Sequence, residues 1–205
     1  MTELFISALI TFFVAIDPPG CAAIYASMTT DASPAQRRAM AFRAIFVSAI
    51  ILLVFGFFGE ALLTAIGVSL DSFRIAGGIM LFIIALEMVF EKRTERREGR
   101  AQEIIDTPEI EDVSIFPMAM PMIAGPGSIA ALMLFIGRAE SAMEQWVVLA
   151  AVGVILLVML FSMLLAGPLM KIMGQKVETV ITRVLGVILA ALAIQFVVDG
   201  LKASF

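Results

Sequence analysis

The sequence contains six apolar stretches, and each is about as long as a helix that spans a lipid bilayer. Such a helix needs about 20 consecutive, mostly apolar residues. The chain has 205 residues, of which 61% are hydrophobic and only 16% charged, whereas ordinary globular domains have roughly 45–50% apolar and about 25% charged residues. We therefore predict an all-α integral membrane protein with six transmembrane helices, near residues 4–28, 39–58, 74–90, 115–136, 146–166 and 184–199.

The composition argues against several classes of function. The chain has one cysteine, Cys21, and no histidine, so we expect no disulfide, thiol relay or metal site. The net charge of −4 supplies no basic stripe for nucleic acid. We find no nucleophile paired with a base, and we expect neither an enzyme nor a bound cofactor. The first stretch lacks preceding basic residues and a cleavage site, so we expect it to stay in the mature protein.

The 14 basic residues indicate an orientation, because Lys and Arg collect in cytoplasmic loops. With the N-terminus outside, three basic residues lie outside (Arg74, Arg138 and Lys202) and eleven lie inside (Arg37, Arg38, Arg43, Lys92, Arg93, Arg96, Arg97, Arg100, Lys171, Lys176 and Arg183). If the first and fourth stretches are instead re-entrant hairpins, ten lie inside and four outside. We expect a multi-pass protein of the inner (plasma) membrane with both termini periplasmic or extracellular.

The two halves of the chain resemble each other. An offset of 107 residues places IDPPGCAA over IAGPGSIA and ALLTAIG over PLMKIMG, and an offset of 109 places FRIAGGI over TRVLGVI. Each half holds three helices, an odd number, so the second half enters the membrane from the opposite face. We predict two inverted three-helix repeats, residues 1–90 and 113–205. A polar cytoplasmic linker, residues 91–112, joins them; we expect it to be solvated with its basic half against lipid headgroups, or else to dock a soluble partner.

Proline and glycine interrupt the first and fourth stretches at corresponding places, in AIDPPG (15–20) and in PMIAGPGS (121–128). Proline lacks an N–H group and crowds the preceding turn, so we predict that the first and fourth helices are discontinuous. Unpaired backbone groups are costly in hydrocarbon, so such a break is packed in protein or lines a polar cavity. Each restarting helix offers N–H groups and a positive dipole end. Inversion directs both toward the midplane, where a carboxylate fits.

Asp17 is an acid in the middle of a predicted span. It is either a helix N-cap or the partner of a substrate ammonium or of a coupling cation, H⁺ or Na⁺, and the two roles are compatible. An ammonium between Asp17 and a bound carboxylate relieves their repulsion, which favours a zwitterion over a simple anion. The predicted substrate site consists of Asp17, Pro18, Pro19, Gly20, Cys21, Gly125, Pro126, Gly127 and Ser128, with Asp17 also the candidate for the coupling ion.

Other residues have structural interpretations. We expect Glu87 and Gln195, near helix ends, to reach toward the membrane interface. We expect Gly77, Gly78 and Gly186 to mark close helix packing.

The segments DVSIFPMAMPMIAGPGSIA (112–130), AIDPPG (15–20) and FRIAGGIMLFIIALEM (73–88) resemble the hallmark segments of the MarC family of integral membrane proteins, which includes SnatA-type neutral amino acid transporters. The resemblance implies six helices in inverted repeats, with discontinuous first and fourth helices. For some members it implies transport of small neutral amino acids such as glycine and alanine. The residues that match the family's motifs are Asp17, Pro18, Gly20, Gly125, Pro126 and Gly127. Where the family commonly has Asn and, two residues later, Pro, this chain has Cys21 and Ala23, which suits a somewhat bulkier or less polar ligand.

Together these inferences favour a secondary transporter or exporter of small neutral amino acids or similar zwitterionic metabolites, with alternating access at the two helix breaks. The alternative is a membrane sensor or scaffold that transports nothing. The expected partners are the small-molecule substrate and the lipid bilayer, with no nucleic acid, and the sequence sets no oligomeric state.

Overall fold

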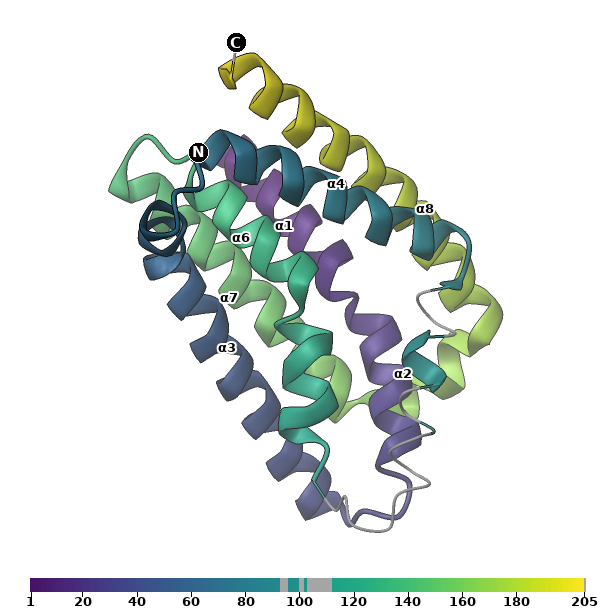
Figure 1. Ribbon diagram of the computed structural model, residues 1–205. Helices are drawn as coiled ribbons and strands as arrows, with labels where there is room; N and C mark the ends of the chain where they lie inside the picture. The colour runs from purple at the N-terminus through teal and green to yellow at the C-terminus, as the bar shows by residue number, and fades with distance from the viewer. Residues whose placement is uncertain (93–95, 100–101, 103–111, 205) are drawn as a thin grey trace.

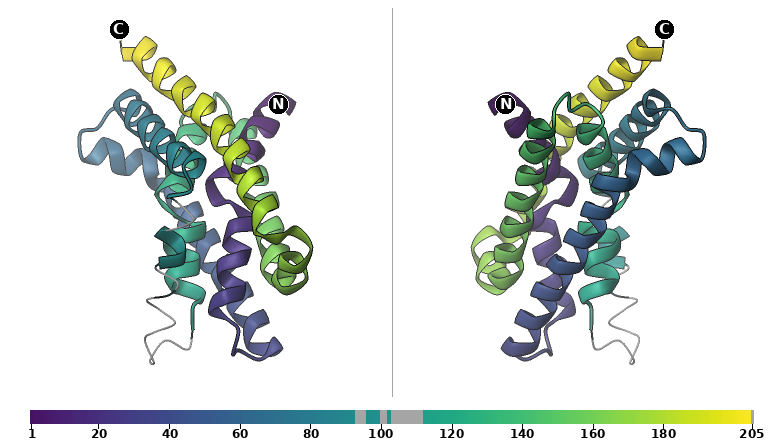
Figure 2. Two further views of the ribbon diagram at one scale, coloured as in Figure 1. Left: turned by 90° about the vertical axis from the view of Figure 1, so that its right-hand side faces the viewer. Right: turned by 90° about the vertical axis from the view of Figure 1, so that its left-hand side faces the viewer.

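The computed structural model describes residues 1–92, 96–99, 102 and 112–204, without the side chains of residues 168–179. Much of the predicted linker, with Arg93 and Arg100, and the side chains of Lys171 and Lys176 lie outside this description. The described residues form helices and no strand, in the order α1 (Thr2–Ile16), α2 (Pro18–Met28), α3 (Pro34–Ala65), α4 (Leu70–Val89), η1 (Ser114–Ile123), α6 (Pro126–Ile136), α7 (Ala142–Leu164) and α8 (Ala166–Ser204). Both termini lie at the same end of the bundle (Figures 1 and 2).

The helices match the six predicted apolar stretches. Five spans are long and apolar enough to cross a membrane: Thr2–Met28, Pro34–Ala65, Leu70–Val89, Ala142–Leu164 and Val180–Ser204. The bent pair formed by η1 and α6 makes up to six if it is counted as one span. The prediction of an all-helical, multi-pass membrane protein is therefore confirmed.

Three of the long helices begin at a serine that caps them. Ser33 accepts a hydrogen bond from the Gln36 N–H and the Gln36 side chain bonds back to the Ser33 N–H, which is a capping box at the start of α3. Ser69 and Ser141 cap α4 and α7 in the same way, through the N–H groups three residues on. These caps satisfy donors that the first turn of a helix leaves unpaired.

Helices α4 and α8 run side by side and pack closely (Figures 1 and 2). Glycines make the close approach possible. A Cβ atom on Gly78 of α4 would lie 2.8 Å from the Ala193 carbonyl oxygen of α8, and one on Gly186 of α8 would lie 3.0 Å from the Ala85 carbonyl oxygen of α4. The prediction that these glycines mark helix packing is confirmed.

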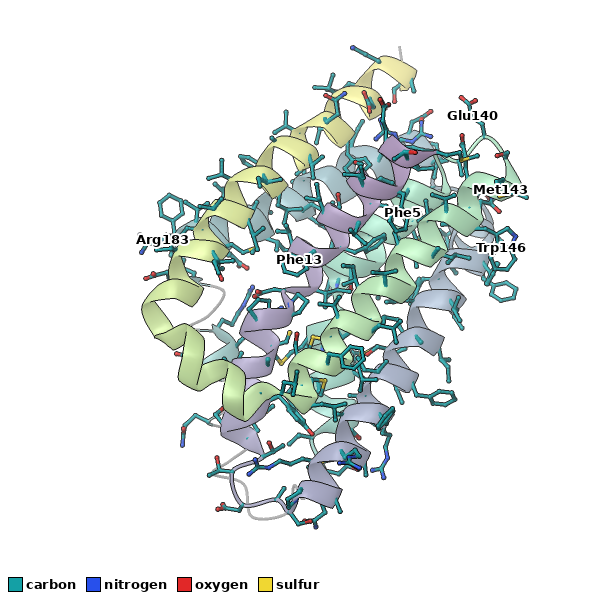
Figure 3. All side chains as sticks on the ribbon, turned by 180° about the vertical axis from the view of Figure 1, so that it is seen from behind. Phe5, Phe13, Glu140, Met143, Trp146 and Arg183 are labelled. Atoms are coloured by element: carbon teal, nitrogen blue, oxygen red, sulfur yellow. The ribbon has the colours of Figure 1, made fainter. Side chains whose placement is uncertain are left out.

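The span made by α1 and α2 lies at the centre of the bundle. Over an apolar stretch of 18 residues this span is 56% buried, against 28% for the corresponding stretches of α3 and α4. Helix α6 is also largely enclosed, with buried residues from Gly127 to Phe135. The outer faces are apolar instead: Trp146 is 63% exposed at the edge of α7 (Figure 3) and packs edge-on against Phe57. Such faces suit contact with lipid.

Candidate functional site

Asp17, at the first predicted helix break, lies between the end of α1 and the start of α2. Its backbone is left-handed, with φ 60° and ψ 67°, a conformation that Asp adopts more readily than most residues. The Asp17 N–H donates to the Phe13 carbonyl oxygen and the Asp17 carbonyl accepts from the Cys21 N–H, both at 2.9 Å. Pro18 and Pro19 occupy the first positions of α2, where a helix needs no N–H group.

The Asp17 side chain caps α2, as one of the two predicted roles requires. Its Oδ1 atom accepts a hydrogen bond from the Gly20 N–H at 3.3 Å. Pro18 and Pro19 have no N–H, so the first turn of α2 has no donor left for a ligand. The expectation that this helix start presents unpaired N–H groups to a carboxylate is therefore wrong. Gly20 leaves room for the cap, because a Cβ atom there would lie 2.5 Å from Asp17 Oδ2.

The second break lies between η1 and α6, which meet at an angle of 50°. Inside η1, Phe116 (φ −124°, ψ 126°) and Met120 (φ −130°, ψ 123°) have extended backbones. Each precedes a proline, Pro117 or Pro121, and a residue before proline is pushed away from the helical region. Here too the irregular backbone follows directly from the position of proline in the sequence.

Helix α6 begins without a side-chain cap, unlike α2. Its N-cap is Gly125, which has no side chain, and Pro126 takes the first helical position. The Ser128 hydroxyl donates to the carbonyl oxygens of Ile123 (2.6 Å) and Gly125 (3.0 Å) and does not cap the N–H groups of the first turn. The positive end of the α6 dipole therefore has no carboxylate or hydroxyl cap among the described residues.

A cavity of about 670 Å³ lies against this helix start. Its volume is within the range of ordinary small-molecule sites, roughly 300–1,000 Å³. Apolar side chains of α4 and η1, such as Ile83, Ile84 and Phe116, form much of the wall. The polar and charged part of the described lining consists of Glu87, Arg96, Arg97 and Ser128.

Arg97 links the cavity to the first break. Its Nη1 atom donates to Asp17 Oδ2 at 3.0 Å, and the two side chains are only 10% and 5% exposed. Buried charges are normally paired in this way, because an unpaired charge is costly away from water. The neighbouring Arg96 pairs with Glu87 near the end of α4. Residues 96–99 of the linker are therefore held beside the cavity by two ion pairs from different parts of the chain.

These contacts correct one expectation. Arg97 was expected in a solvated linker near lipid headgroups, but it is buried against Asp17, 80 residues away in the sequence. The expectation failed because Arg97 has a partner in the fold that its own segment does not contain. Glu87, near the end of α4, pairs with Arg96 and lines the cavity.

The structure places the predicted site residues in two groups. Gly125, Pro126, Gly127 and Ser128 line the cavity. Among the described lining residues, the five from the first break (Asp17, Pro18, Pro19, Gly20 and Cys21) are absent, and Asp17 is connected to the cavity through Arg97. Cys21 is fully buried, and its thiol donates to the Ile16 carbonyl oxygen at 3.2 Å.

Sequence reasoning missed Glu87, Arg96 and Arg97 as cavity residues. One signal was present: a carboxylate in the middle of a span needs a positive partner, and the apolar stretches hold none near Asp17. The basic run of the linker was the nearest source of such a charge.

Five to six helices that are long and apolar enough to cross a membrane define a multi-pass integral membrane protein. The chain belongs to the MarC family: residues 2–205 match the family described as MarC family integral membrane protein. The resemblance seen in the sequence is thereby confirmed.

Two relatives show how far the similarity extends. The UPF0056 membrane protein YhcE of Escherichia coli (strain K12) is 34% identical over 196 residues, which cover 96% of this chain and 91% of the relative. A UPF0056 membrane protein of Methanocaldococcus jannaschii is 32% identical over 202 residues, which cover 98% of each chain. These names describe membrane proteins and state no activity. No solved structure matches the chain.

Proposed function

We propose that this protein is a secondary transporter or exporter of small neutral amino acids or similar small zwitterions. One observation carries the proposal: a cavity of about 670 Å³ with charged groups in its wall lies beside one helix break and is linked by an ion pair to the other. Interrupted helices with a site between them are typical of secondary transporters. Interrupted backbone in hydrocarbon also requires protein or a polar cavity around it.

Inverted repeats and discontinuous first and fourth helices are part of this proposal, and the helix contacts support them. If α1–α4 and η1–α8 are equivalent units, helix contacts should have counterparts after exchange, and several of the more extensive contacts do. Helices α1 and α2 pack on α7, as η1 and α6 pack on α3; α2 packs on α8, as α6 packs on α4. Helices α4 and α8 pack on each other. Movement of one unit against the other would open the cavity to alternate sides.

The cavity suits a solute with both charges and a small apolar part. Its wall contains Glu87, two arginines and the uncapped start of α6, with apolar residues of α4 around them. Asp17 stays the candidate for a coupling H⁺ or Na⁺. We further propose the inner (plasma) membrane with both termini outside, so a reporter fused after Phe205 that is active only in the periplasm should report activity.

Counterflow into liposomes that contain the purified full chain tests the function. We expect the wild type to exchange radiolabelled glycine or L-alanine. The variant Gly127→Leu should not, because a Cβ atom there already lies 2.6 Å from Ile84 Cδ1 and a longer side chain enters the cavity. Gly153→Leu is the matched control, since a Cβ atom at Gly153 meets nothing within 4 Å.

Folded wild-type protein that neither binds nor exchanges any small neutral amino acid, with or without a proton or sodium gradient, would overturn the proposal. That result would favour the alternative of a sensor or scaffold. Exchange by Gly127→Leu at the wild-type rate would instead place the site elsewhere in the bundle.

A further inference from the structure

The Arg97 side chain contacts Asp17 and also lines the cavity, whereas Asp17 is not among the described lining residues. A guanidinium has five N–H donors in one plane, and the contact with Asp17 uses the Nη1 atom. Its planar fork matches the two oxygens of a carboxylate, and a second carboxylate can approach another edge of the same plane. The geometry therefore lets one arginine serve a protein carboxylate and a ligand carboxylate together.

Donor groups at the cavity also favour an anionic group. Arg96 is paired with Glu87 and Arg97 with Asp17, so these four charges balance, and the attraction for a carboxylate comes from the remaining guanidinium N–H donors and from the start of α6. The start of α6 at Gly127 and Ser128 lines the same cavity without a side-chain cap. Its N–H groups and dipole add to the attraction for an anion. By contrast, the first turn of α2 is closed by its prolines and by the Asp17 cap.

We propose that Arg97 is a ligand-binding residue that takes the carboxylate of the solute, together with the start of α6. Asp17 is then a positioning residue: it caps α2, holds the Arg97 guanidinium beside the cavity and does not itself contact the ligand. This inference rests on the proposed function and assigns the carboxylate side of its site to a residue of the linker. It moves the role predicted for Asp17 from ligand contact to support.

Three small probes separate the two charged ends of an amino acid. L-alanine has both ends, propionate has the carboxylate alone, and L-alaninamide has the ammonium alone. Each is titrated against the full chain in detergent, and affinity is taken from the rise in apparent melting temperature, since a ligand of the folded state stabilises it. We expect L-alanine and propionate to stabilise the wild type and L-alaninamide to leave it unchanged.

Variants of the ion pair then assign the carboxylate site. Arg97→Gln should weaken binding of L-alanine and propionate by ~10–100-fold, the loss expected for a hydrogen bond between charged groups. Arg97→Lys should retain part of the affinity, because the lysine ammonium is a point charge that lacks the planar fork of arginine. The double variant Asp17→Asn/Arg97→Gln leaves no buried charge unpaired and should show the same loss in a protein that folds.

Two further variants test the role of Asp17 and check that breaking an unrelated ion pair has no effect on binding. Asp17→Asn keeps a residue that can cap α2 and leaves the Arg97 guanidinium without its counter-charge, so propionate and L-alanine should both bind at least as tightly as to the wild type, because the ligand carboxylate then compensates that charge. Arg43→Gln is the matched control: it breaks the pair with Asp112, whose side chains are 51% and 43% exposed, and should change no affinity.

The outcomes separate this inference from the proposed function. L-alanine binding that survives in Arg97→Gln and in the double variant overturns the role of Arg97 and leaves transport intact. The same holds if L-alaninamide binds as tightly as L-alanine. If Asp17→Asn loses L-alanine but keeps propionate, Asp17 contacts the ammonium and its positioning role is wrong. A wild type that responds to none of the probes overturns both proposals.

Discussion

Replacing Asp17 by Asn isolates the charge of the buried ion pair. Asn is also a good N-cap and also accepts a left-handed backbone, so the bond to Gly20 and the φ of 60° are compatible with the substitution. What is lost is the partner of a guanidinium that is only 10% exposed. Removing one member of a buried pair costs roughly 3–5 kcal/mol, because the other charge stays buried without compensation. The cavity beside Arg97 gives some relief, so we expect about 3 kcal/mol.

A double-mutant cycle measures the pair itself. The free energy of unfolding is compared for wild type, Asp17→Asn, Arg97→Gln and the double variant by reversible denaturation in mixed micelles. We expect the double variant to be more stable than the sum of the single changes by at least ~2 kcal/mol. The control cycle uses Arg43 and Asp112, whose side chains are 51% and 43% exposed, and should give about 0.2–1 kcal/mol.

The reasoning fails if both cycles give the same small interaction energy. Arg97 and Asp17 would then behave as a solvated surface pair, and Arg97 would have no fixed place at the helix break. A large interaction energy in the control cycle alone would also contradict the reasoning. It would mean that Arg43 and Asp112, and not Asp17 and Arg97, form the buried pair.

Three further predictions concern packing and exposure. Gly78→Ala should destabilise the protein by about 1–3 kcal/mol, because its Cβ atom would lie 2.8 Å from a backbone oxygen of α8. Gly153→Ala, whose Cβ atom meets nothing within 4 Å, should be neutral or slightly stabilising in the same unfolding assay. Trp146, the single tryptophan, is 63% exposed near the start of α7, so lipids brominated close to the headgroup should quench its fluorescence more than lipids brominated deep in the chain. Cys21 is 0% exposed and should react with a maleimide only after unfolding in detergent; rapid reaction of the native protein would contradict its burial.

Sequence reasoning located the spans well because the bilayer imposes a simple rule of length and apolarity. Thr2–Met28 and the bent pair of η1 and α6 both coincide with predicted stretches. It also placed the irregular backbone, since the effects of proline are local: Phe116 and Met120 are extended because a proline follows each of them. Features that depend on one residue and its immediate neighbours are the ones a sequence specifies directly.

The two breaks were treated as alike, and their chemistry shows that they differ. In DPPG, the prolines remove two N–H groups and Asp17 takes the next one, at Gly20. In AGPGS, the cap position is Gly125 and the helix starts without a side-chain cap. The repeat offset aligned the prolines but ignored how many donors each sequence leaves. Counting the N–H groups in each motif predicts an anion site at α6 and none at α2.

The pairing of Asp17 with Arg97 is the feature that local reasoning could not supply, because 80 residues separate the partners. A polar linker has the composition of a solvated segment whether or not one of its side chains turns inward. The requirement for a counter-charge does constrain the answer: an acid at 5% exposure needs a cation, and the described spans offer none beside it. A long, always charged side chain entering from the linker satisfies that requirement without placing a second charge inside a span. An acid within an apolar helix is therefore best understood together with the basic loop that can reach it.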